Sequence, residues 1–214
     1  CICFNLAILG FFKYFNFFTE GLSTMLWLVG FQPNPTTLNI ILPLGISFYT
    51  FQVMSYPIDI YWNRIKPTKR FFDFALFVAF FPLIISGPIE RARNLLPQII
   101  NKRNITAERF YEGCWLIFWG LYKKIVIADN LAKLTTNVFM NYTGGRPGGF
   151  TLLTTFAFTF QLYADFSGYS DMARGLARVM GFDIMLNFRT PFFSKNPSDL
   201  WQRWHISLTT WIKE

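Results

Sequence analysis

The chain has 214 residues, of which 52% are hydrophobic, 20% aromatic and only 15% charged. Soluble domains carry about 25% charged residues, and a soluble core of this size could not bury 27 phenylalanines. The composition excludes an ordinary soluble domain and predicts an integral membrane protein, because lipid lets apolar side chains face outward. The net charge of +8 does not indicate nucleic acid, because the basic residues punctuate apolar segments instead of forming one stripe.

The three cysteines, Cys1, Cys3 and Cys114, form no CxxC pair and have no histidine near them. A disulfide framework or a zinc site is therefore not expected. The first residues lack the basic region and the cleavage site of a signal peptide. We interpret residues 1–214 as one membrane domain, and we expect it to be part of a longer protein.

Two apolar segments occupy the N-terminal part of the chain. Residues 1–31 could hold the end of one span and a second short one, and an uncharged turn follows at 32–37. Residues 38–62 are long enough to cross roughly 30 Å of hydrocarbon. Pro43, Gly45 and Pro57 predict that this segment is kinked or broken. Asp59, near its end, is expected at the membrane interface and not in the interior.

Basic stretches flank a shorter apolar segment in the middle of the chain. Residues 64–70 form a basic loop, residues 71–86 are apolar and contain Pro82, and residues 91–109 are basic again. Basic flanks on both sides of so short a segment predict a re-entrant or interfacial element.

Two longer segments follow. Residues 111–130 are a candidate span in which Lys123 and Lys124 must snorkel or face a wet cavity. The loop 143–149 is nearly uncharged and is placed outside, so residues 150–175 return inward.

The returning segment carries two carboxylates, Asp165 and Asp171. They either face a cavity or pair with Arg174 or Arg178 to hold helices together. Gly168 and Gly175 would allow another helix to approach closely.

The only histidine lies in a segment with the pattern of an amphipathic helix. Asn196 is a good N-cap and Pro197 suits the first helical position. Asp199 and Arg203 stand four residues apart and can pair. Three- and four-residue steps predict one shared face for Trp201, Trp204, His205, Leu208 and Trp211, beside a polar stripe of Arg203, Ser207 and Thr210.

Two interpretations of His205 are open. It is a packed ring whose nitrogens are satisfied by neighbours, or it is a base. The chain has no G-x-S-x-G, no Walker loop and no His-Glu-x-x-His. A lone imidazole suits acyl transfer from a thioester, which needs a positioned hydroxyl and a group that takes its proton. Indole neighbours would lower the pKa of the imidazole and keep it neutral.

Residues 200–211 resemble the Trp-x-x-Trp-His-x-Ser-x-Ser-x-Trp signature of membrane-bound O-acyltransferases, the MBOAT family. Other blocks of that family are matched in the same order by residues 42–52, 86–91 and 165–171, followed by 181–182, 187–188 and 191–193. The block at 166–171 is most similar to the alginate O-acetyltransferase branch. The chain departs from the family at Lys213-Glu214, where Arg-Asp is usual, and at Arg189-Thr190.

The resemblance implies an all-α, polytopic membrane bundle with broken or re-entrant helices around a tunnel. His205 would be the catalytic residue in that tunnel. The family carries a second histidine further downstream, so His205 either acts as the base or positions substrate, and the fragment alone is expected to be inactive. Arg203 either touches donor phosphates or lipid head groups, or pairs with Asp199. The residues expected to line the tunnel or contact substrate are Trp201, Arg203, Trp204, Ser207, Asp165 and Asn187.

The resemblance also implies an O-acyltransferase in the inner membrane of a bacterium. It would move an acyl group, which we expect to be acetyl, from acetyl-CoA or another cytoplasmic thioester to a hydroxyl of an extracytoplasmic polysaccharide. Partner proteins outside the membrane would present the polysaccharide. We expect no bound cofactor, no metal and no nucleic-acid partner. The alternatives are a teichoic-acid-type D-alanyl transferase and a translocation subunit without transferase activity.

Overall fold

The computed structural model describes residues 1–31, 43, 45–84, 87–140 and 148–214. Within these ranges the regular elements are helices, which confirms the predicted all-α class. In chain order they are α1 (Ile2–Leu28), α2 (Ile46–Tyr61), α3 (Phe71–Val78), α4 (Phe81–Ile84), α5 (Ala92–Ile100), α6 (Ala107–Leu121), the π-helix η1 (Tyr122–Ala128), α7 (Asp129–Met140), α8 (Gly148–Val179), the 3-10 turn η2 (Pro191–Phe193), α9 (Pro197–Arg203) and α10 (Ile206–Lys213).

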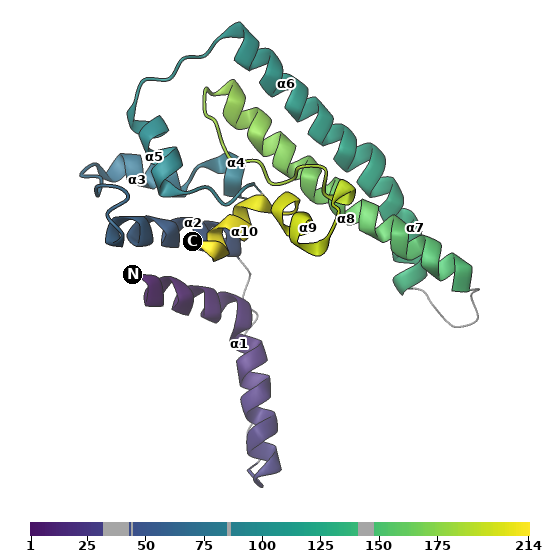
Figure 1. The fold of residues 1–214 in the computed structure, drawn as a ribbon. Coiled ribbons are helices and arrows are strands. Elements are labelled where there is room, and N and C mark those ends of the chain that lie inside the picture. Colours follow the sequence, from purple (N-terminus) through teal and green to yellow (C-terminus); the bar gives the residue numbers. More distant parts are fainter. Residues whose placement is uncertain (32–42, 44, 85–86, 141–147) are drawn as a thin grey trace.

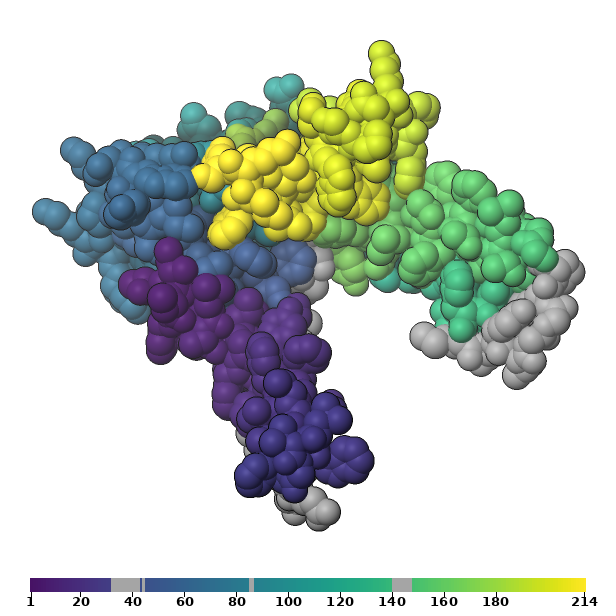
Figure 2. All heavy atoms as spheres, turned by 60° about the horizontal axis from the view of Figure 1, so that its bottom comes forward, coloured from purple at the N-terminus to yellow at the C-terminus, as the bar shows by residue number. Residues whose placement is uncertain are grey.

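Helix α1 is a long apolar helix that begins beside α2, bends, and then projects away from the rest of the chain (Figures 1 and 2). Its 27 residues rise about 40 Å, more than the hydrocarbon core of a bilayer. Among the described helices it is the one that is both long and apolar enough to cross a membrane. The prediction of two span pieces within residues 1–31 was wrong, because one continuous helix occupies the segment. The predicted turn at 32–37 lies outside the described residues.

Of the segment predicted over 38–62, residues 38–42 and 44 lie outside the described residues. Helix α2 begins directly after Gly45, which has a left-handed backbone (φ 73°). A Cβ at this position would lie 1.8 Å from the carbonyl oxygen of Ile84, so only glycine fits. Pro57 lies inside α2, which still extends to Tyr61.

The prediction that Asp59 lies at an interface was wrong, because its side chain is fully buried. The chain after α2 turns back on itself, and the Arg64 and Ile65 amides both donate to the Asp59 carbonyl. This turn brings Arg64 Nη1 within 3.7 Å of the Asp59 carboxylate. This ion pair is the contact that offsets the burial of the charge, although neither carboxylate oxygen accepts a hydrogen bond from the described residues.

The segment predicted to be too short for a span forms the two short helices α3 and α4. Phe71–Ile84 rises only about 20 Å, less than the thickness of the hydrocarbon core. The side chains of this segment pack with α5 and the end of α8. They form the core cluster of Phe77, Phe80, Leu83, Ala92, Leu95, Leu96, Ala177 and Phe182.

The longest feature of the fold is a hairpin. Helix α6, the π-helix and α7 form one continuous rod beside α8 (Figure 1), and each arm is roughly 50 Å long. The predicted close approach at Gly168 and Gly175 is confirmed, and each meets a glycine of α6. A Cβ on Gly168 would lie 2.8 Å from the Gly120 oxygen, and one on Gly175 would lie 2.6 Å from the Gly113 oxygen.

Helices α9 and α10 lie against the middle of this hairpin and reach toward α2 (Figure 1). Trp211 of α10 meets Phe51 of α2 with ring centroids 5.0 Å apart, and its indole Nε1 donates to the Phe51 carbonyl at 3.2 Å. The fold therefore places His205 between the hairpin and the cluster of short helices.

Candidate functional site

The single helix predicted over residues 196–211 is interrupted at His205. Helix α9 ends at Arg203, α10 begins at Ile206, and His205 between them has a left-handed backbone with φ 43° and ψ 52°. The prediction of one continuous helix was therefore wrong. The physical reason is a competing partner. The Ile206 amide donates to the Asn187 carbonyl at 2.9 Å, and the Arg189 amide donates to the Arg203 carbonyl at 2.9 Å. These bonds take the place of the intrahelical ladder.

A buried chain of hydrogen bonds holds this interruption. Asn187 Nδ2 donates to Ser170 Oγ at 2.9 Å, and Ser207 Oγ donates to Asn187 Oδ1 at 2.6 Å. The Ile89 amide completes the chain by donating to Ser207 Oγ at 3.0 Å. Asn187 and Ser207 are two of the six residues predicted to line the tunnel, and each is at most 1% exposed. Their contacts tie α8, the segment before α9, α10 and the chain before α5 together directly behind His205.

The His205 ring packs edge-on against Phe166 of α8, with centroids 4.8 Å apart. Its Nε2 is buried and has no hydrogen-bond partner among the described residues. Burial lowers the pKa of His205 to about 4, so the imidazole is neutral at physiological pH. A buried side-chain nitrogen without a protein partner is uncommon in folded proteins.

A cavity of about 580 Å³ opens beside the ring. Trp201, Trp204 and His205, which were predicted to share a site, all line it. Trp204 also packs against Phe188, with centroids 5.1 Å apart, so one side of the indole belongs to the aromatic interior. The remaining lining residues are Ser198, Leu208, Thr209, Ile212 and Lys213.

Arg203 does not line this cavity and instead makes the predicted ion pair. Its Nε lies 2.7 Å from Asp199 Oδ1, across one turn of α9. Asn196 caps the same helix, because its Oδ1 accepts from the Asp199 amide at 2.8 Å. Both features follow from the spacing of these residues in the sequence.

The predicted ion pair between Asp171 and Arg174 is present, and two lysines that the sequence did not predict as partners also pair with the carboxylates of α8. Asp165 lies 2.7 Å from Lys124 Nζ, which also reaches Asp129 at 2.8 Å. Asp171 pairs with the buried Lys123, and the predicted partner Arg174 is at 3.6 Å. The two lysines lie in the π-helix, whose wider turn brings both of them to the α8 side.

Arg178, the other predicted partner of these carboxylates, lies elsewhere. It pairs with Glu112 at 2.6 Å and with Asp183. Asp165 belongs to a cluster of Lys124, Asp129 and Asp165, which we call the Lys124 cluster, and it does not line the His205 cavity.

Glu90 is a buried residue that was not singled out from the sequence, although it lies in the block at 86–91. Its carboxylate accepts from the Met185 amide at 2.7 Å and from Asn94 Nδ2 at 3.0 Å. It fixes the chain carrying the Ile89 amide to the segment that leads to Asn187. The sequence signal was a glutamate in an otherwise apolar run, which needs partners if it is buried.

Taken as chemistry, the arrangement is a neutral imidazole on an apolar wall, beside an aromatic-lined cavity. A neutral imidazole can act as a general base toward a hydroxyl held against it. Apolar walls exclude water, which would compete for an activated acyl group.

Comparison with known proteins adds the family. Residues 66–214 match the model of the membrane-bound O-acyltransferase family, MBOAT. The chain is 46% identical over 212 residues to a probable alginate O-acetylase AlgI of Pseudomonas aeruginosa, covering 98% of this chain and 40% of that protein. It is 35% identical over 240 residues to a peptidoglycan O-acetyltransferase of Helicobacter pylori, covering 98% of this chain and 44% of that protein.

A teichoic acid D-alanyltransferase of Bacillus subtilis is 32% identical over 193 residues, with 86% of this chain and 47% of that protein covered. The chain thus spans less than half the length of these curated relatives. The family match covers most of the chain and includes the segment around His205. The chain belongs to the membrane-bound O-acyltransferase family.

Proposed function

We propose that the protein containing this chain is a membrane-embedded O-acyltransferase. It transfers an acetyl group from a cytoplasmic thioester, acetyl-CoA, to a hydroxyl of a polysaccharide outside the inner membrane of a bacterium. The observation that carries the proposal is the neutral His205 imidazole at an aromatic-walled cavity, in a chain of the MBOAT family. The choice of acetyl follows the alginate O-acetylase relatives, which are more similar to this chain than the D-alanyltransferase is.

In the proposed mechanism His205 acts at the acceptor. A sugar hydroxyl attacks the thioester carbonyl, an O–C bond forms, and the imidazole takes the hydroxyl proton. The C–S bond then breaks, and the proton passes to the leaving sulfur to give the free thiol. The donor is already activated, so no covalent enzyme intermediate is needed and the main contribution of the site is positioning. A depressed pKa keeps the imidazole ready to accept a proton at neutral pH.

The residues around His205 have different proposed roles. Trp201 and Trp204 form the cavity wall against which the acyl chain and the acceptor pack. Asn187 and Ser207 hold the His205 backbone from behind. Arg203 stabilises α9 through Asp199, and Asp165 joins the Lys124 cluster in the hairpin. Partner proteins on the far side of the membrane present the polysaccharide.

The test is acetyl transfer by the full-length protein in membranes, with labelled acetyl-CoA and the polysaccharide as acceptor. His205→Ala is expected to reduce turnover by roughly 10²- to 10⁴-fold, the usual contribution of a general base. Arg203→Gln is the matched control, because it changes a neighbour that does not line the cavity. Unchanged turnover in the His205→Ala variant would remove His205 from the mechanism. Absence of transfer by the wild-type protein, with polymer export intact, would favour a translocation subunit.

A further inference from the structure

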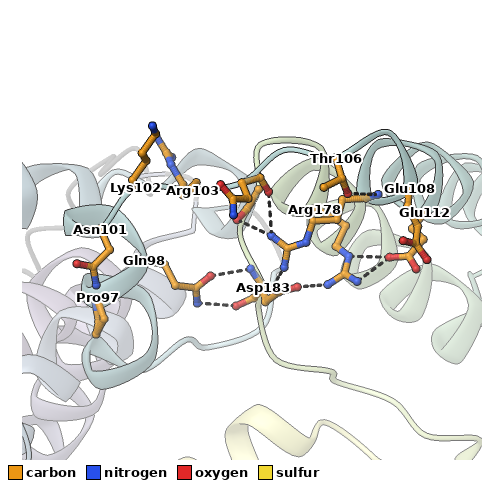
Figure 3. A pocket seen from close by; sticks show the side chains of 13 residues that line it. Pro97, Gln98, Asn101, Lys102, Arg103, Thr106, Glu108, Glu112, Arg178 and Asp183 are labelled. Atoms are coloured by element: carbon orange, nitrogen blue, oxygen red, sulfur yellow. Dashed lines mark hydrogen bonds and ion pairs between the residues drawn. The ribbon is translucent and has the colours of Figure 1, made fainter.

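A second cavity, of about 640 Å³, lies at the other end of the hairpin, where α6 begins and α8 ends. It shares no lining residue with the His205 cavity. Its walls come from the end of α5, the connection to α6, the start of α6 and residues 178–183 (Figure 3). The lining is strongly polar, which is unusual in so apolar a chain.

Most charges in this cavity neutralise one another. Arg178 lies between Glu112 and Asp183, with its Nη2 2.6 Å from the Glu112 carboxylate (Figure 3). Arg109 pairs with Asp183 as well and donates to the Gly181 carbonyl at 3.2 Å. Gln98 closes the group by accepting from the Asp183 amide at 2.7 Å. Two guanidinium groups and two carboxylates are thereby satisfied, and they form a rigid and neutral floor.

Three charged side chains of the lining lie outside this network. Lys102 and Arg103 have no carboxylate partner within the described part of the chain. The Arg103 guanidinium lies 4.4 Å from the Phe182 ring centroid, which leaves its N–H groups free to donate at their edge. Glu108 is the remaining carboxylate, and it stands in the first turn of α6, where the helix dipole favours it. The balance is one excess positive charge, with two cationic donors adjacent in sequence.

The outer surface beside this cavity is apolar and aromatic. Ile105, Phe110, Tyr111 and Trp115 are between 48% and 73% exposed, at the same end of the hairpin. Aromatic side chains beside Lys and Arg at a helix end are typical of the membrane–water interface. Lys102 and Arg103 would then lie at the depth of the lipid phosphates, where basic side chains attract anionic head groups.

We propose that Lys102 and Arg103 bind a phosphate group at this cavity, supplied by the head group of an anionic phospholipid such as phosphatidylglycerol. The arginine fork suits two phosphate oxygens and the lysine adds a point charge, a combination that recurs in phosphate recognition. The pyrophosphate of coenzyme A has the same chemistry and is the soluble source to be distinguished. The inference concerns binding alone and does not depend on the proposed acetyl transfer.

The experiment uses the full-length protein in a neutral detergent, titrated separately with short-chain phosphatidylglycerol, short-chain phosphatidylcholine and coenzyme A. Bound ligand is counted by native mass spectrometry. The wild-type protein is expected to prefer phosphatidylglycerol to phosphatidylcholine. The variant Lys102→Gln with Arg103→Gln is expected to bind phosphatidylglycerol roughly 30-fold more weakly, from the loss of two charges at the lipid surface.

The matched control is Lys66→Gln with Lys69→Gln, which removes the same charge from exposed positions outside this cavity. It is expected to bind phosphatidylglycerol as the wild type does. Loss of coenzyme A binding in the Lys102/Arg103 variant, with lipid binding intact, would keep the phosphate site and assign it to the soluble donor. Wild-type binding of both ligands by that variant, or equal loss in the control, would overturn the proposal.

Discussion

His205 adopts a backbone conformation that costs a non-glycine residue about 1 kcal/mol or more. The cost is offset by the bonds around it, which run from Ser170 through Asn187 to Ser207 and the Ile89 amide. Asn187 is the centre of this chain, because its amide donates on one side and accepts on the other. The sequence analysis named both His205 and Asn187 as candidate site residues. It could not predict that the Asn187 carbonyl accepts from the Ile206 amide, because the two residues lie in separate segments.

Asn187→Ala is expected to leave the Ser170 and Ser207 hydroxyls without their partner, at a cost of about 1–3 kcal/mol in the free energy of unfolding. The His205 backbone then loses its support. Acetyl transfer by the full-length protein should fall by roughly tenfold in kcat, with little change in the KM for acetyl-CoA, because Asn187 lies behind the cavity and not in it.

Asn196→Ala is the control for that variant, because it removes the N-cap of α9 at a similar cost of about 1 kcal/mol without touching the buried chain. Thermal unfolding of both variants measures the loss of stability. Turnover at a temperature where both variants are folded measures the effect on kcat that does not come from unfolding. Equal losses of kcat in the two variants would reduce Asn187 to a stability role.

At the scale of elements, the hairpin depends on two glycine contacts and one π-helix. Glycines at 113 and 120 in α6 meet glycines at 175 and 168 in α8, so the helices touch backbone to backbone. The π-helix then brings Lys123 and Lys124 to the carboxylates of α8. Wide turns of this type often mark functional positions. The glycines of α8 were predictable from sequence, whereas a π-helix has no sequence signature of comparable strength.

Gly168→Ala is expected to force α6 and α8 apart, because the new Cβ would lie 2.8 Å from the Gly120 oxygen. The expected loss is about 1–3 kcal/mol, the usual cost of overpacking a close contact. Gly149→Ala in the same helix is the control, since its Cβ would meet nothing within 4 Å. Thermal unfolding in detergent separates the two. A Gly168→Ala protein as stable as the Gly149→Ala protein would contradict the close-packed hairpin.

At the scale of the whole molecule, the charge pattern predicts which side of the membrane each connection faces. The basic stretches at 64–70 and 91–109 are expected in the cytoplasm, and the start of α8 is expected outside. Among the described helices, α1 alone meets the length and hydropathy criteria for a span. The two arms of the hairpin have a lower mean hydropathy because they carry Lys123, Lys124, Asp165 and Asp171. That these arms cross the membrane stays a prediction.

Cysteine labelling of the full-length protein in intact cells tests this arrangement. In a background where Cys1, Cys3, Cys114 and every cysteine outside residues 1–214 are replaced by serine, Gly148→Cys should react with an impermeant maleimide. Thr68→Cys, in the basic loop, should react only after the cells are opened. Reaction of both positions in intact cells would contradict the predicted topology.

The residues by themselves determined the class of this protein and its family. An excess of aromatic and apolar side chains has no place in a soluble core, and the pattern around His205 is specific enough to mark a family. They also determined local features that depend on neighbours in sequence, such as the Asp199–Arg203 pair and the Asn196 cap.

Only the tertiary structure decided where α9 and α10 separate and whether Asp59 is buried. It also decided which lysines meet the carboxylates of α8. Each of these depends on a partner distant in sequence, such as the Asn187 carbonyl that takes the Ile206 amide from the helical ladder. Periodicity reports how a segment would fold alone, whereas a competing hydrogen bond from another segment is determined by the packing of the whole chain.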